Sequence, residues 1–351
     1  MTLVDGLAGG SLIGISAAIL LLFGGEIMGA SGIVNSTLLS FSKVTNDPLQ
    51  HWKLFFLSGF LLISRYFLVP RFENLHDIAD SRSTLAYITA GLFVGFGTKL
   101  GNGCTSGHGI CGLGRLSIRS FSAVLTFMLS AVATTYMTQN DDIWRNIVTA
   151  TEDTRAVTNP TQIASQASFA IILFLALTGA LVSIFRAKKE TPSYFKNLVG
   201  LVTGCLFASG LFIGGMVNPD VVSSFLNVSG IPLGTWDPSL VAVMGSGVVF
   251  SFLSYQMIDG YQLSSLFGAT TNNGLSKPLV GPKFSIPTNS QVDHSLLVGA
   301  ASFGVGWSLT GLCPAPALFM AAAGVPQAVF QWWPAYFVGA SLAQHIKEHY
   351  V

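Results

Sequence analysis

The segment GFGTKLGNGC, residues 95–104, recurs as GVGWSLTGLC at residues 304–313. The two copies are displaced by 209 positions and share Gly95, Gly97, Leu100 and Cys104 with Gly304, Gly306, Leu309 and Cys313. A second correspondence, displaced by 190 positions, pairs Gly14, Gly24, Gly25, Asp47 and Pro48 with Gly204, Gly214, Gly215, Asp237 and Pro238. Glycines could match by chance in a chain so rich in glycine. The matches also include an Asp-Pro pair at one offset and a cysteine at the other, which makes chance a poor explanation. The sequence therefore predicts two related halves.

The composition around these segments is that of a membrane protein. The chain has 351 residues, of which 50% are hydrophobic and 9% are charged, whereas a soluble domain carries about 25% charged residues. Apolar runs of about 20 residues, enough to cross a bilayer, recur along it. We expect an all-α integral membrane protein in contact with the lipid bilayer. The net charge of +1 argues against a nucleic-acid partner.

Hydropathy predicts about nine transmembrane helices, with boundaries uncertain by a few residues. These helices are expected at residues 9–28, 52–70, 84–100, 118–137, 168–186, 197–217, 239–258, 294–312 and 326–345. Glycines interrupt the apolar pattern at 21–33 and 211–222, which predicts segments that enter the bilayer, break and turn back. Such broken backbone is tolerated at depth only where protein buries it or where it lines a cavity.

The repeat divides one membrane domain into three parts. Residues 1–137 form the first half, 138–193 an outer polar loop with a linking helix, and 194–351 the second half. If each half crosses the membrane four times, the single linking helix inverts the second half relative to the first. Inverted repeats with broken helices are a recurrent transporter architecture, with the substrate near the middle of the membrane.

The charges of two loops predict the orientation. Segment 186–196 carries four basic residues and one acidic residue, whereas 138–167 carries four acidic and two basic residues. Positive charge favours the cytoplasmic side. We therefore expect 186–196, Arg115 and Arg119 in the cytoplasm and 138–167 outside.

Glycines crowd the segment GNGCTSGHGICGLGR, residues 101–115. Their density predicts a loop rather than a continuous helix, leading into a helix that begins near 116–119. Exposed backbone N–H groups in such a loop make an anion site. The spacing of Cys104, His108 and Cys111 also allows a metal site completed by Cys313, or a Cys104–Cys111 disulfide. The simplest alternative is that the cysteines are small buried residues.

Three other residues have competing interpretations. Pro314 follows Cys313 directly and breaks a helix there, which leaves the thiol at a helix end. Lys99 is a lone cation in an apolar stretch, and either its side chain reaches the membrane surface or it attracts an anion. Cys205 has no cysteine at the corresponding repeat position, so we expect it to be a buried structural residue.

At these motifs the chain resembles the YeeE/YedE sulfur-transport family. The resemblance is carried by 95–120, 303–318, and 210–230 with 236–247, and it extends over most of the chain except 138–167 and 270–293. It implies thiosulfate uptake, with some members suspected of moving other sulfur or selenium species. It also implies an hourglass-shaped protein whose central constriction is lined by cysteines.

The resemblance assigns the central roles to Cys104 and Cys313, and a secondary one to Cys111. The full set of candidate substrate residues is Cys104, Cys313, Cys111, His108, Gly103, Thr105, Ser106, Gly107 and Pro314, with Lys99 as a possible attractant. The chain departs from the family pattern at two places. The family has a cysteine early in the first half, whereas this chain has Met28 and Ser31 in the corresponding segment. Ala315 stands where a glycine is commoner in the family.

We therefore expect a transporter for thiosulfate or a related sulfur anion in the cell membrane, without cofactor or metal. A cytoplasmic sulfurtransferase is a candidate acceptor of the sulfur. The alternative is a membrane sulfurtransferase in which a cysteine forms a persulfide and His108 acts as the base. A third interpretation is a metal-dependent redox protein that uses Cys104, His108 and Cys111.

Overall fold

The computed structural model describes most of the chain. The described residues are 1–72, 75–149, 163–168, 170, 171, 174, 175, 177–179, 193–262 and 274–350. Within these residues the fold is helical, and its only β contacts are two isolated bridges. The predicted all-α class is confirmed.

The elements before the outer loop are α1 (Leu3–Gly24), α2 (Ala30–Leu39), α3 (Phe41–Asn46), η1 (Pro48–Gln50), α4 (Trp52–Ile63), η2 (Ser64–Leu68), η3 (Val69–Arg71), α5 (Leu75–Asp80), α6 (Thr84–Leu100), η4 (Thr105–Gly112), α7 (Ile118–Asn140) and α8 (Asp142–Val148). Those after it are α10 (Ser193–Ile213), α11 (Pro219–Leu226), η6 (Val228–Gly230), α12 (Ser239–Gln256), α14 (His294–Thr310), α15 (Pro314–Ala323), η7 (Ala328–Trp332) and α16 (Trp333–Tyr350).

Six helical stretches of the described chain are long and apolar enough to cross a membrane. They are Leu3–Gly24, Pro48–Arg71, Ile118–Asn140, Tyr194–Ile213, Ser239–Gln256 and His294–Ala323. Three of the nine predicted spans are not among them. Residues 84–100 form a shorter apolar helix, α6, and 326–345 is divided between η7 and α16, whose end is polar. The predicted span 168–186 lies largely outside the described residues.

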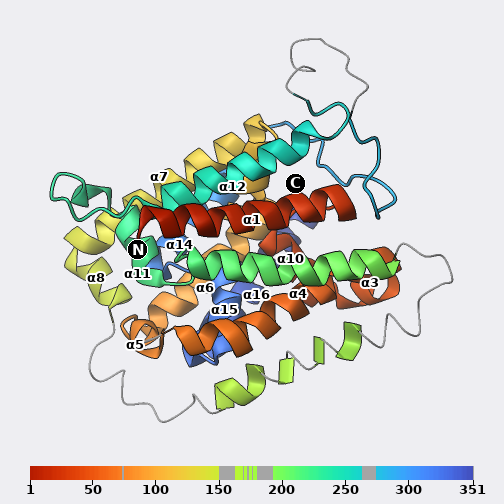
Figure 1. Ribbon diagram of the computed structural model, residues 1–351. Helices are drawn as coiled ribbons and strands as arrows, with labels where there is room; N and C mark the ends of the chain where they lie inside the picture. The colour runs from red at the N-terminus through yellow and green to blue at the C-terminus, as the bar shows by residue number, and fades with distance from the viewer. Residues whose placement is uncertain are drawn as a thin grey trace.

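Two pairs of long helices form the centre of the bundle (Figure 1). Gly9, near the start of α1, lies against Gly214, just after the end of α10. Ser16, later in α1, donates from its Oγ to the carbonyl of Thr203, which lies earlier in α10 (2.8 Å). The helices α1 and α10 therefore run in opposite directions. The helices α6 and α14 are also antiparallel, because Val94 meets Gly306 and Gly101 meets Gly299.

Four further helices complete the bundle. The helix α12 packs on α1 and α4 packs on α10, while α16 packs on α6 and α7 packs on α14. Glycines bring these helices close, because a backbone without Cβ can approach another backbone directly. Close backbone contacts at glycines thus pack these helices together with the buried aromatic side chains.

The two predicted glycine breaks are confirmed. The helix α1 ends at Gly24, and Gly25 caps it in the left-handed region (φ 73°). The helix α10 ends at Ile213, followed by Gly215 with φ 64°. Each break leads into a short helix, α2 or α11, rather than into another long span.

The predicted loop over 101–114 is wrong in its larger part. Residues 105–112 form a π-helix, η4, and only the preceding 101–104 are not helical. The glycines here serve close packing: a Cβ on Gly112 would lie 2.2 Å from Ser120 Oγ. The following helix α7 begins at Ile118, as predicted.

Replacing Gly9 with alanine tests this packing. Its Cβ would lie 2.3 Å from the Gly214 nitrogen and 2.7 Å from the Gly210 carbonyl oxygen, atoms of a backbone that cannot turn aside. We expect Gly9→Ala to lose about 1–3 kcal/mol of stability, measured as thermal unfolding in detergent. The matched control is Gly32→Ala, whose Cβ would meet nothing within 4 Å. Equal unfolding temperatures for the two variants would contradict the expected clash.

Candidate functional site

The two cysteines matched by the repeat occupy the same position on two short helices. Cys104 is the N-cap residue of η4, and Cys313 is the N-cap residue of α15. Both are buried, with 1% and 3% of their surface exposed. Each thiol therefore lies at the beginning of a helix inside the protein, as predicted for Cys313 from the proline that follows it.

Each of the two thiols has a hydroxyl group as its hydrogen-bond partner. Ser106 Oγ lies 3.3 Å from Cys104 Sγ, and Thr105 Oγ1 lies 3.6 Å from Cys313 Sγ. Because Thr105 belongs to η4 and Cys313 precedes α15, the second contact joins segments 208 residues apart. The structure thus brings together four of the predicted site residues.

The broken segment after α1 forms another wall of this site. The backbone N–H of Ala30, the first residue of α2, donates to Ser106 Oγ (3.0 Å). The Cys111 thiol donates to the carbonyl of Met28 (3.3 Å). Cys111 therefore contacts the broken segment rather than the other thiols, and Gly107 passes close to Gly29 in the same segment.

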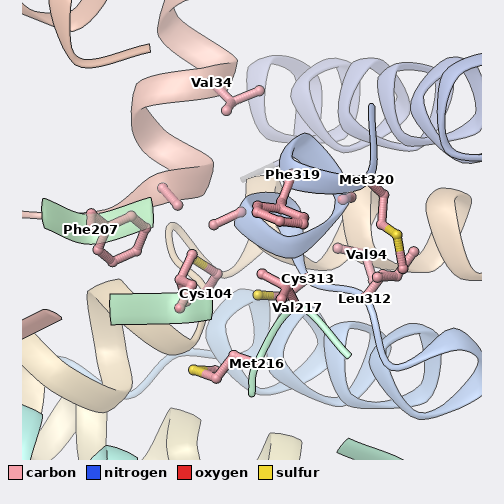
Figure 2. Packing of buried hydrophobic residues seen from close by; sticks show 14 of the residues in the cluster. Val34, Val94, Cys104, Phe207, Met216, Val217, Leu312, Cys313, Phe319 and Met320 are labelled. Atoms are coloured by element: carbon pink, nitrogen blue, oxygen red, sulfur yellow. The ribbon is translucent and has the colours of Figure 1, made fainter. Parts of the chain in front are cut away.

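A small cavity of about 10 Å³ lies where these elements meet. Its lining includes Thr105, Ser106 and Cys313, together with Phe207 and Met216. Cys104 is one hydrogen bond away, through Ser106. Figure 2 shows both thiols with Phe207, Met216 and Phe319 around them. A volume of this size admits about one water molecule, so the structure is closed at this point.

The electrostatics of the cavity favour an anion. The N-termini of α2, η4 and α15 come together here, and a helix N-terminus carries partial positive charge. None of the described residues that line the cavity is acidic. Pro314 is the first residue of α15 and lacks an N–H group. It therefore shapes the helix start without donating a hydrogen bond.

His108 points away from both thiols. Its Nδ1 lies 3.1 Å from Ser120 Oγ, and its Nε2 lies 3.1 Å from the Gly101 carbonyl oxygen. Gly103 leaves room for the ring, because a Cβ there would lie 2.6 Å from the imidazole. Both ring nitrogens are thus engaged elsewhere, and the structure does not join His108 with Cys104 as a base and nucleophile.

In the described part of the chain, the residues are arranged neither as a metal site nor as a disulfide. All four cysteines are free thiols. Among the described residues, no three His, Cys, Asp or Glu side chains are grouped so that they could hold a metal ion. Cys205 lies apart from the site, where its thiol donates to the Gly59 carbonyl (3.4 Å) between α10 and α4.

Lys99 lies at the end of α6 and is not among the residues lining the cavity. Its carbonyl accepts a hydrogen bond from Lys347 Nζ (2.8 Å), which also donates to Asn102 Oδ1 (2.7 Å). Another cation, Arg119, pairs with Asp293 at 2.7 Å. Lys99 thus belongs to a basic group at one end of the bundle.

Sequence reasoning missed a buried polar group formed by Asn35, Thr98 and Tyr336. The Tyr336 hydroxyl donates to Asn35 Oδ1 (2.9 Å) and lies 3.2 Å from Thr98 Oγ1. No local pattern in the sequence marks these residues as a group, because Asn35 stands beside Ser36 and Thr98 stands beside Lys99.

Comparison with known proteins adds an independent line of argument. Residues 3–133 match the family described as sulphur transport, and residues 195–348 match a family of unknown function, DUF6691. A probable transporter of Xylella fastidiosa (strain Temecula1 / ATCC 700964) is 37% identical over 133 residues, which are 38% of this chain and 78% of that protein. A second probable transporter of this strain is 40% identical over 126 residues, 36% of this chain and 87% of that protein.

Proposed function

Because the chain belongs to the sulphur transport (YeeE/YedE) family, whose relatives found here are probable transporters, we propose that it takes up thiosulfate through the constriction between Cys104 and Cys313. The observation that carries this proposal is the pair of buried thiols at the beginnings of two short helices, beside a cavity closed to about one water. A related small sulfur anion would satisfy the same chemistry.

The two ends of thiosulfate need different partners. Its terminal sulfur is soft and polarisable and suits the weak S–H donors of the cysteines. Its oxygen atoms need N–H and O–H donors, since an anion is costly to bury without them. The hydroxyl groups of Thr105 and Ser106 supply such donors next to the thiols. Weak contacts with each thiol in turn would let the anion pass without being held.

We further propose that the chain consists of two inverted halves, 1–137 and 194–351, joined by 138–193 and narrowed to an hourglass at the thiols. Equivalent close contacts support this repeat. Gly95 packs against Tyr336, and Gly304 packs against Phe127, so both partners are displaced by 209 positions. The equivalent helices α1 and α10 are antiparallel, as are α6 and α14, which agrees with inversion.

The lengths of the relatives also support two halves. The same aligned residues make up 38% of this chain and 78% of the first Xylella fastidiosa protein. That relative is therefore about half as long as this chain. A transporter half of that size would form its constriction with a second copy, whereas here one chain supplies both halves.

The proposed orientation follows the loop charges. Segment 186–196 would lie in the cytoplasm and 138–167 outside, in the cell membrane. The basic group at Lys99, Arg119 and Lys347 would then lie at the cytoplasmic end, where it would attract the emerging anion. A cytoplasmic sulfurtransferase is the class of enzyme that would use the delivered sulfur.

Uptake into proteoliposomes tests the proposal. Thiosulfate labelled in one experiment on the terminal sulfur, and in another on the central sulfur, is expected to deliver both labels to the lumen at equal rates. Protein-free vesicles are the control. If the terminal label stayed on the protein while sulfite remained outside, the chain would be a sulfurtransferase; if neither label entered, thiosulfate transport would be refuted.

A further inference from the structure

The buried polar group of Asn35, Thr98 and Tyr336 joins three helices near the thiols. Asn35 is on α2, Thr98 on α6 and Tyr336 on α16. The exposed fractions of the three residues are 8%, 2% and 0%. Groups so deeply buried require hydrogen-bond partners, because each one left unpaired costs free energy.

The hydrogen bonds of this group fix the orientation of the Asn35 amide. Tyr336 has one hydroxyl proton, which it donates to Asn35 Oδ1 (2.9 Å), while its oxygen lies 3.2 Å from the Thr98 hydroxyl. With its oxygen held by Tyr336, the amide turns its NH₂ group the other way. Among the described residues this NH₂ group has no hydrogen-bond partner. Two N–H donors are therefore held in place and unused.

The free NH₂ group lies close to the transport site. The helix α2 begins at Ala30, whose N–H contacts Ser106 beside Cys104. Asn35 is five residues further along this helix, a rise of about 7.5 Å. Tyr336, its partner, lies within electrostatic reach of both Cys104 and Cys313. The amide therefore lies about one and a half helical turns from the thiol site along α2.

The polar group occurs on one side of the bundle alone. At the repeat offsets of 190 and 209, Asn35 corresponds to Phe225, Thr98 to Trp307 and Tyr336 to Phe127. The Phe127 and Trp307 rings pack against each other, 6.2 Å apart, and the Phe225 ring packs against Trp236. A polar group needed only for helix packing would not explain why the equivalent place is filled with aromatic rings.

We propose that Asn35, oriented by Tyr336 and Thr98, binds the oxygen atoms of the substrate while the cysteines contact its terminal sulfur. This subsite rests on the proposed function and makes it more specific, since it selects anions that carry an –SO₃ group over sulfur anions without oxygen. A neutral amide suits this task, because it donates hydrogen bonds without the charge that would hold the anion tightly.

Competition during thiosulfate uptake tests the subsite. Methanesulfonate keeps the three oxygen atoms and replaces the terminal sulfur with a methyl group, whereas hydrosulfide keeps sulfur without oxygen. In Asn35→Leu we expect the KM for thiosulfate and the inhibition constant of methanesulfonate to rise about tenfold. Inhibition by hydrosulfide should change less than twofold. A parallel weakening of both inhibitors, or of neither, would overturn the subsite.

A second variant covers the case in which Asn35→Leu does not fold. Tyr336→Phe removes the hydroxyl that orients the amide, and we expect the same selective loss, about threefold to tenfold. The matched control is Tyr87→Phe, because Tyr87 is equally buried and donates to the Ala79 carbonyl (3.0 Å) far from the thiols. If Tyr336→Phe and Tyr87→Phe kept identical selectivity, the subsite would be refuted. Wild-type protein without any thiosulfate uptake would instead refute the proposed function.

Discussion

Replacing Cys104 or Cys313 with alanine is expected to lower thiosulfate uptake at least about 100-fold, equivalent to about 2.7 kcal/mol at the barrier. Both thiols are buried at helix beginnings, and each is hydrogen-bonded to a hydroxyl at the constriction. An alanine there offers no donor to the passing sulfur and leaves an apolar gap. Initial rates of labelled thiosulfate entry into proteoliposomes, corrected for the amount of folded protein, measure the effect.

The other two cysteines provide graded controls. Cys205→Ala should leave uptake unchanged, because this thiol contacts Gly59 between α10 and α4. Cys111→Ala should lower uptake several-fold, since it removes the contact that holds Met28 in the broken segment. Equal activity of Cys104→Ala, Cys313→Ala and Cys205→Ala would show that transport does not depend on the central thiols.

Replacing Glu26 with glutamine is expected to destabilise the protein by about 3–5 kcal/mol. Glu26 Oε1 lies 2.7 Å from Lys196 Nζ, and the exposed fractions of these side chains are 15% and 5%. A second cation is close, because Lys53 and Lys196 both approach the Trp52 ring, at 5.8 and 6.0 Å. Without Glu26, the buried Lys196 ammonium would lose its partner while the half-buried Lys53 ammonium remains close to it.

The size of the loss should depend on which partner is removed. Lys196→Met should cost less than Glu26→Gln, because Lys53 remains to balance the carboxylate. The double variant should recover part of the loss, since it leaves one cation instead of two. Thermal unfolding of the four proteins in detergent forms a double-mutant cycle. A double variant as unstable as the sum of the single ones would contradict a direct ion pair.

The sequence correctly predicts that the fold is helical and where two of its helices end. It does not predict the conformation of the glycine-rich segment 101–114. Glycine pairs at 24–25 and 214–215 mark helix ends, because the left-handed turn of Gly25 and Gly215 favours glycine. The glycines of 101–114 have another physical role. They allow η4 to pack closely against Ser120, and the residues just after it to pack against Ser251. Composition alone does not distinguish glycine that frees a loop from glycine that lets a helix approach its neighbour.

The sequence also predicts some residues of the candidate site and misses others. A matched repeat position singles out Cys104 and Cys313, and the family resemblance is confirmed by the sulphur transport match. His108, although only four residues from Cys104, faces Ser120 and Gly101 instead. Spacing along the chain fails here because η4 is a π-helix, whose wider turn changes which side chains share a face. The contact between Tyr336 and Asn35 could not be predicted from the sequence, because it joins residues 301 positions apart.

The small cavity beside the thiols also bears on how well the membrane holds its proton gradient and voltage. Protons cross membranes rapidly along continuous files of hydrogen-bonded water, and small ions need a hydrated channel. If the proposed passage runs through the cavity of about 10 Å³ lined in part by Phe207 and Met216, that point holds only about one water molecule, too few for a continuous file. A bilayer containing this protein would therefore keep its proton gradient and membrane voltage while the protein is idle. In the proposed transporter, the narrowness of the passage would keep the membrane impermeable to small ions without a separate plug.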